Sequence, residues 1–113
     1  MPWWWHLAPF LVHVCVALGN RAQAEVLYQR LEPWADLDMV SEVQSFHGSV
    51  QHHLGLLALT MGRGRRAVRH LTEARRRHEA AGSPPWVKLT TAALARAEWL
   101  EATPGDHSVS VRP

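Results

Sequence analysis

Eight histidines and one cysteine are the side chains of this 113-residue chain that could bind a metal ion or attack a substrate. Metal sites on a helix favour two ligands four residues apart, and no pair among His47, His52 and His53 has that spacing. Cys15 follows His13 by two residues, so on a helix the two side chains point in different directions. We therefore expect no metal or cofactor, and we interpret the histidines as helix-surface or hydrogen-bonded core residues and Cys15 as an inert core residue.

The acidic residues give no sign of catalysis either. Glu73, Glu98 and Glu101 show no pairing that would place a general acid and a general base in one cleft. The phosphate-binding pattern GxxxxGK[ST] does not occur in the sequence. We predict that the protein is not an enzyme, and about one equivalent of bound metal in the purified protein would contradict that prediction.

Positive charge is concentrated in one segment, although the formal net charge is only +2. Seven arginines lie within a predicted helix at residues 63–78 whose other face is apolar. Such a helix could lie across phosphates and gain affinity from counterion release. Arginine is also a good helix former whose stem covers apolar surface, and no aromatic residue is interleaved for base stacking. We interpret the cluster as a solvated outer face, and an acidic protein or a nucleic acid is the alternative partner of Arg65, Arg66, Arg69, Arg75, Arg76 and Arg77.

The composition predicts a helical globular protein of a reducing compartment. The chain is 47% hydrophobic and 19% charged, which allows a packed core, and alanine and leucine dominate while isoleucine is absent. Many arginines against one lysine suggest a GC-rich bacterial genome. A single cysteine cannot form an internal disulfide, so we expect a cytoplasmic protein. The apolar stretch 7–18 is too short to span a membrane and no basic residue precedes it, although Ala-Gln-Ala at 22–24 leaves a signal peptide as an alternative.

Glycines and prolines divide the chain into five predicted helices. No segment alternates apolar and polar residues for long enough to predict a strand. The predicted helices cover residues 7–18, 21–32, 39–61, 63–81 and 84–102, and they end at Gly19, Pro33, Gly62, Gly82 and Pro104. Residues 33–38 are predicted to form a loop with Trp34 in the core, and residues 106–113 a flexible tail.

A shift of 43 residues places the first pair of helices on the second, and Gly19, Gly62 and Gly105 share this spacing. The apolar stripe of the third helix has a counterpart in the first, and we expect both to be buried. The stripes are Val50, Leu54, Leu57, Ala58 and Met61 in the third helix and Leu7, Leu11, Val14, Cys15 and Leu18 in the first. Further matches are Trp3 with Phe46 and Leu89, Ala24 with Ala67, Tyr28 with Leu71, and Leu31 with Ala74.

The second unit carries the residues that resemble the signature of a tetratricopeptide repeat: Leu54, Gly55, Ala58, Gly62, Ala67, Leu71 and Ala74. The family has small residues where its paired helices approach closely. The first unit departs from this pattern because Val12 stands at the position of Gly55 and Leu31 at that of Ala74, which implies a wider helix crossing. The period of 43 also exceeds the usual figure of about 34 residues. Long repeats of this kind are similar to those in the C-terminal region of large bacterial ATP-dependent LuxR-type transcriptional regulators, and the resemblance covers about residues 3–105.

The predicted fold is all-α, with five helices in two helix-turn-helix units and a half unit, stacked as a short right-handed α-solenoid. The domain would span residues 1–105, with units at 3–38, 39–82 and 83–105. The resemblance implies protein–protein interaction or scaffolding, as a fragment of a bacterial signalling or transcriptional regulator. The repeat would be defined by Gly19, Ala24, Tyr28, Leu54, Gly55, Ala58, Gly62, Ala67, Leu71, Ala74 and Gly105.

By the same resemblance, the first helix of each pair would line the inner face. This nominates His6, His13, Ser49, His52, Leu56 and Leu59 as partner contacts. No Lys or Asn stands among these positions, so a basic clamp for a peptide carboxylate is not expected. Trp3, Trp4 and Trp5 cannot all face inward on a helix, and the 43-residue register assigns Trp3 to the core. Any of the three tryptophans that is exposed would contact an adjoining domain or a second copy. No membrane partner is expected.

Overall fold

The computed structural model describes residues 4–36, 38–40 and 46–102, which form five α-helices and one short β-hairpin. The helices are α1 (Ala8–Leu18), α2 (Arg21–Leu31), α3 (Val50–Thr60), α4 (Gly64–Ala80) and α5 (Pro84–Ala102). Short 3-10 helices η1 (Trp5–Leu7) and η2 (Glu32–Trp34) adjoin α1 and α2, and strands β1 (Asp38–Val40) and β2 (Phe46–Ser49) pair antiparallel. Within these ranges no helix is both long enough and apolar enough to cross a membrane. Trp3, Gly105 and the predicted tail lie outside the described residues.

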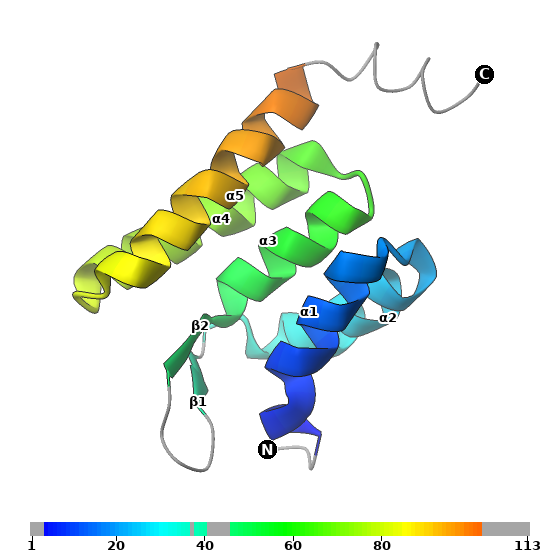
Figure 1. Ribbon diagram of the computed structural model, residues 1–113, viewed down its shortest axis with the longest axis horizontal. Helices are drawn as coiled ribbons and strands as arrows, with labels where there is room; N and C mark the ends of the chain where they lie inside the picture. The colour runs from blue at the N-terminus through cyan, green and yellow to red at the C-terminus, as the bar shows by residue number, and fades with distance from the viewer. Residues whose placement is uncertain (1–3, 37, 41–45, 103–113) are drawn as a thin grey trace.

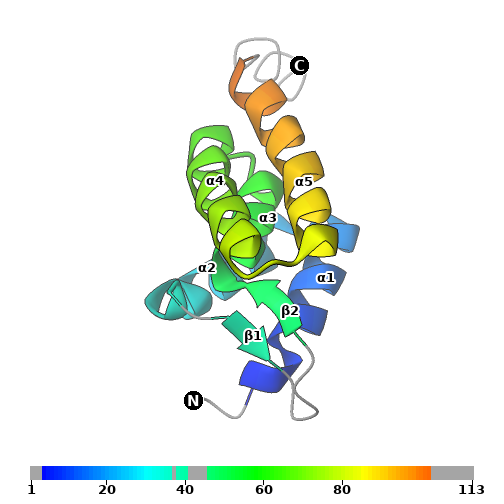
Figure 2. The ribbon, with the colours of Figure 1, turned by 90° about the vertical axis from the view of Figure 1, so that its left-hand side faces the viewer.

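Helix α3 lies at the centre of the molecule, between the α1–α2 pair and the α4–α5 pair (Figure 1). It contacts all four other helices, and α4 packs along α5. Figure 2 shows α4 and α5 side by side and the hairpin of β1 and β2 beyond their ends. The molecule is elongated, with extents of 47 × 28 × 21 Å.

The predicted helix ends are confirmed at the turns. Gly19, Gly62 and Gly82 adopt left-handed φ angles of 63°, 75° and 67°, and each follows the end of a helix. The side chain of Asn20 caps α2 by accepting a hydrogen bond from the backbone N–H of Gln23 at 3.0 Å. These ends are fixed by local backbone chemistry, which is why the sequence predicts them to within about two residues.

The predicted helix at 39–61 is wrong in its first half, because the chain forms the hairpin there and α3 begins only at Val50. Gly48 adopts a left-handed φ of 84°, which a continuous right-handed helix cannot contain. The ring of Trp86 also covers Gly48 so closely that a Cβ there would lie 2.8 Å from Cζ3. Ser49 then starts the helix, since its Oγ accepts a hydrogen bond from the backbone N–H of His52 at 3.4 Å.

The core is built around α3, and its predicted apolar stripe is buried. The stripe predicted for the first helix is wrong except at Cys15, because Leu7, Leu11, Val14 and Leu18 are 42–73% exposed. Helix α1 instead buries Ala8, Val12 and Cys15. The difference follows from position: α3 has neighbours on both sides, whereas α1 lies at one end of the molecule (Figure 1).

The N-terminal tryptophans contribute to the core near α1. Trp5 is buried and Trp4 is half-buried. The ring of Trp34 meets that of Trp5 edge-on at 5.6 Å, and Trp34 itself is half-buried rather than fully enclosed. The register prediction for Trp3 cannot be compared with this arrangement because Trp3 is not among the described residues.

Candidate partner-binding groove

A groove of about 640 Å³ lies between α1, α3 and α5, the first helix of each predicted unit. Its lining is mostly apolar and comes from all three helices. The lining residues are Pro9, Phe10, Val12 and His13 of α1, His52, His53 and Leu56 of α3, and Trp86, Leu89, Ala92, Ala93 and Arg96 of α5.

The shape and charge of the groove determine what it can bind. Phe10 and Leu89 stand on opposite walls with 66% and 55% of their surface exposed, and Leu56 is half-buried. Arg96 is exposed and is the one lining residue with a permanent charge. The groove can therefore bury an apolar side chain and hold a carboxylate at its Arg96 end.

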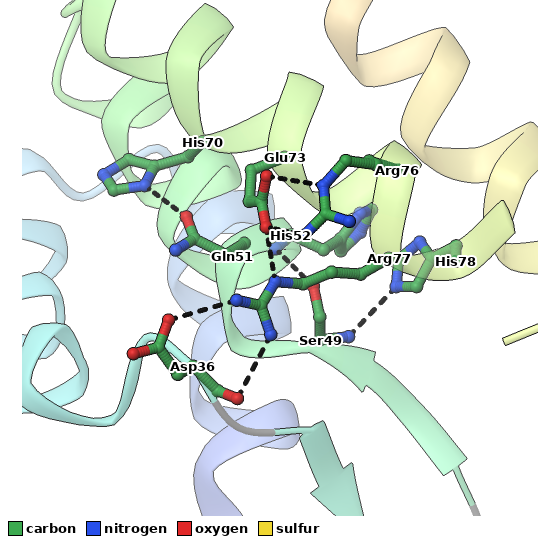
Figure 3. A network of polar contacts seen from close by, with 9 residues as sticks. All are labelled: Asp36, Ser49, Gln51, His52, His70, Glu73, Arg76, Arg77 and His78. Atoms are coloured by element: carbon green, nitrogen blue, oxygen red, sulfur yellow. Dashed lines mark hydrogen bonds and ion pairs between the residues drawn. The ribbon is translucent and has the colours of Figure 1, made fainter. Parts of the chain in front are cut away.

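A buried hydrogen-bond chain supports the floor of the groove. The backbone N–H of Ser49 donates to Nε2 of His78 at 3.0 Å, so neutral His78 carries its proton on Nδ1 (Figure 3). That proton can be donated to Oγ1 of Thr90 at 3.0 Å. The Thr90 hydroxyl then donates to Nδ1 of His52 at 2.7 Å. The chain ties β2, α3, α4 and α5 together beneath the groove.

The imidazole of His52 at this floor is held neutral by its surroundings. Burial, together with the neighbouring His53 and His78, lowers the pKa of His52 to about 3. The indole of Trp86 meets His52 edge-on, with ring centroids 5.2 Å apart, and also contacts His53. At neutral pH His52 and Trp86 therefore present an uncharged aromatic surface at the floor.

A second buried network joins α2, α3 and α4. The amide oxygen of Gln51 can only accept, so Nδ1 of His70 donates to it at 2.6 Å (Figure 3). Nε2 of His70 is then free to accept from the hydroxyl of Tyr28 at 2.6 Å. Burial, together with Arg69 and Arg66, lowers the pKa of His70 to about 4. The guanidinium of Arg66 lies over the Tyr28 ring, 5.3 Å from its centroid.

Three of the six arginines predicted as an alternative binding surface, Arg65, Arg76 and Arg77, form ion pairs with described residues of the chain itself. Arg76 and Arg77 bind the carboxylate of Glu73 at 2.6 and 2.8 Å, and Arg77 also reaches Asp36 at 3.0 Å (Figure 3). Arg65 pairs with Glu101 at 3.5 Å. These acidic partners reduce the positive field that a nucleic acid would meet. Among the described residues, the structure records no ion pair for Arg69 or Arg75 of this face.

The predicted partner contacts are only partly brought together. His13, His52 and Leu56 line the groove, and half-buried Leu59 lines a neighbouring depression that Arg96 also borders. The prediction for Ser49 is wrong, because it is fully buried as the cap of α3. His6 lies in η1, and its side chain is outside the described part of the structure.

Nine of the twelve described lining residues were not nominated from the sequence, among them Phe10, His53, Trp86, Leu89 and Arg96. A signal for three of these was present in the 43-residue register, which places Phe10, His53 and Arg96 at equivalent positions. No such signal indicated Trp86, because its position depends on packing against Gly48 of β2, which is distant in the sequence.

The described residues offer little chemistry beyond binding. They contain no group of three or more His, Cys, Asp or Glu side chains arranged to hold a metal ion. Cys15 is buried as predicted, its thiol donates to the backbone oxygen of Asn20 at 3.4 Å, and burial raises its pKa. A thiol in that setting is a poor nucleophile.

Comparisons of this chain with protein-family models, with curated proteins and with solved structures find no match.

Proposed function

We propose that this chain is a protein-interaction module of tetratricopeptide-like helical repeats, and that its partner binds in the groove between α1, α3 and α5. The observation that carries the proposal is the groove itself: three first helices present a continuous apolar surface with exposed Phe10 and Leu89 on its walls. An exposed apolar groove on a soluble domain is a common site of protein recognition.

Equivalent hydrogen bonds at the helix ends support a repeated unit. At the end of α1, the N–H of Gly19 donates to the oxygen of Val16 at 3.1 Å and that of Asn20 to the oxygen of Cys15 at 3.2 Å. At the end of α3, 43 residues later, Gly62 donates to Leu59 and Arg63 to Ala58, both at 2.9 Å. Gly82 and Ser83 make the same pair of bonds at the end of α4, so the bonds are general to glycine helix ends, and the support for a repeat comes from the 43-residue spacing of the first two turns.

Burial at matched positions supports the same interpretation. Five pairs of residues separated by 43 are buried in both units: Val12 with Gly55, Cys15 with Ala58, Ala24 with Ala67, Tyr28 with Leu71, and Leu31 with Ala74. Contacts run from α1 to α3 and from α3 to α5, as expected of a stack in which each first helix meets the next.

The chemistry of the groove favours a peptide segment that combines apolar and acidic residues. The walls provide aromatic and aliphatic surface, and Arg96 provides a donor for a carboxylate. A cationic segment would find no carboxylate among the lining residues that the structure describes. We therefore expect the partner to insert a large apolar side chain between Phe10 and Leu89 and to place an aspartate or glutamate near Arg96.

Selection from a random peptide library displayed on phage tests this proposal. The wild-type protein should enrich peptides that carry both apolar and acidic residues. These peptides should lose binding to Leu89→Glu, which adds a negative charge to the groove wall, and to Arg96→Glu, which reverses the charge. Leu18→Glu is the matched control, because Leu18 lies on α1 away from this groove. Enriched peptides that bind all three variants equally would show that the groove is not the site.

A further inference from the structure

A second apolar surface lies at the free end of the molecule and is separate from the peptide groove in most of its residues. We define the outer face of α1 as Leu7, Phe10, Leu11, Val14 and Leu18, all of which are exposed. With Val26 of α2, they make up six of the eight large apolar side chains recorded as exposed in the described part of the chain. Helical spacing places Phe10 and Val14 on the side away from Ala8 and Val12, whereas Leu11 and Leu18 lie beside buried Cys15, where α1 adjoins α2.

Residues at the equivalent positions of α3 are all covered. Leu7, Leu11, Val14 and Leu18 correspond, after the 43-residue shift, to Val50, Leu54, Leu57 and Met61. The four α3 residues are at most 8% exposed, because α1, α2, α4 and α5 all pack against that helix. The outer face of α1 thus has the same residue types as a surface that other helices cover in the next unit.

The outer face also has a hollow that can accept apolar side chains. A groove of about 530 Å³ runs between α1 and α2, with Val14 and Leu18 on one wall and Val26 and Leu27 on the other. Buried Cys15 belongs to its lining. The polar lining residues Asn20, Gln23 and Arg30 all come from the α2 side of the groove or its cap.

Charge distinguishes the two ends of the molecule and restricts what can cover this face. Helix α1 contains no Asp, Glu, Lys or Arg. The opposite end presents α5, where Lys88, Glu98 and Glu101 are exposed. A second copy that docked its α5 on α1 would bury these charges against apolar surface at a cost in free energy. A second copy that docked its own α1 would bury no permanent charge of either helix.

We propose that two copies of this chain associate through the outer faces of their α1 helices, related by a two-fold axis close to Val14. Phe10, Val14 and Leu18 follow one another at intervals of four residues, about 6 Å along the helix. An antiparallel crossing centred on Val14 therefore sets Phe10 of each copy over Leu18 of the other. The same patch is used on both copies, so the contact closes at a dimer. It leaves Leu89 and Arg96 of the peptide groove uninvolved but shares Phe10 with that groove.

Sedimentation equilibrium of the full chain over a range of concentrations tests the dimer. The wild type should reach a mass of twice 12.8 kDa, and Leu18→Glu should sediment at 12.8 kDa because it places a charge within the contact. Leu89→Glu is the matched control: it also places a charge on an exposed leucine, but in α5, and should remain dimeric. Val14→Cys should form an intermolecular disulfide on oxidation, since the two-fold axis brings residue 14 of both copies together.

Three results would overturn the proposal. These are a wild type at 12.8 kDa at every concentration, a dimer that persists in Leu18→Glu but dissociates in Leu89→Glu, and masses above the dimer that indicate end-to-end stacking. Val26→Glu on α2 provides a second disruptive variant, and far-ultraviolet circular dichroism checks that each variant is folded. The dimer and the peptide site share Phe10. Leu18→Glu still separates their failures: its mass reports on the dimer alone, and monomeric Leu18→Glu should bind peptides that need Leu89 and Arg96 at least as well as the wild type does.

Discussion

Acidification between about pH 7.5 and about pH 5 should destabilise this protein through its buried histidines. Burial lowers the pKa of His52 to about 3 and that of His70 to about 4, whereas an unfolded histidine has a pKa of 6.5. The unfolded chain therefore binds more protons than the folded one throughout this range. Stability is fully present above the unfolded pKa of 6.5 and declines as the pH falls towards the folded values.

The size of the effect follows from the two shifts. Each histidine that is protonated only in the unfolded state lowers the free energy of unfolding by about 1.4 kcal/mol per pH unit below 6.5. At about pH 5, His52 and His70 together should remove about 4 kcal/mol, a large part of the 5–15 kcal/mol that is typical of a domain. The carboxylate of Glu73 does not contribute here, because its pKa is lowered from 4.5, chiefly by hydrogen bonding to Arg76, and its unfolded form titrates mainly below this range.

Urea unfolding followed by circular dichroism at one fixed protein concentration measures this loss. The free energy of unfolding should fall by about 4 kcal/mol between the two pH values in the wild type. His70→Gln cannot titrate and should reduce the pH-dependent loss by about half, whereas His13→Gln, at an exposed position, should leave it unchanged. A free energy of unfolding that stays constant across the range would refute the assignment of neutral, buried imidazoles.

Three further variants test packing and capping. Gly55→Ala should lower the free energy of unfolding by about 1–3 kcal/mol in chemical denaturation, because a Cβ there would overlap the side chain of Leu71. Ala67→Trp should cost at least as much, since Ala67 is fully buried between helices, and a melting temperature equal to that of the wild type would contradict the assigned packing. Asn20→Ala should lose about 0.5–2 kcal/mol with the cap of α2, while Gln23→Ala keeps the backbone donor and should lose less.

The sequence predicts those parts of the fold that depend on neighbouring residues. Asn20 caps α2 with its own side chain, Gly62 and Gly82 end helices by adopting left-handed φ angles, and Pro84 begins α5. Each of these signals acts within one helical turn. The helical class and the bounds of α2, α4 and α5 could therefore be predicted to within about two residues.

The features that were missed depend on contacts between distant residues. The local sequence around Gly48 does not exclude a helix. The ring that packs on Gly48 before α3 belongs to Trp86, 38 positions later in the chain. The exposure of Leu11 and Val14 has a similar origin. Their spacing is that of any buried stripe, and periodicity cannot reveal whether a neighbouring helix is present to cover them. Most of the groove was missed, including its whole α5 wall, because α5 contributes residues such as Trp86 and Leu89 from outside those nominated by resemblance.

The two buried histidine networks explain how helices rich in alanine and leucine can stack in one register. Apolar contacts are not directional, so α4 could slide along α3 by a turn with little change in buried area. Hydrogen bonds from Ser49 to His78 and from His70 to Gln51 are lost by such a slide, and their buried polar atoms would then be unsatisfied. His78 is also hydrogen-bonded to Thr90, whose hydroxyl holds His52 at the floor of the groove. Protonation that breaks these hydrogen bonds should therefore weaken peptide binding and stability over the same range of pH.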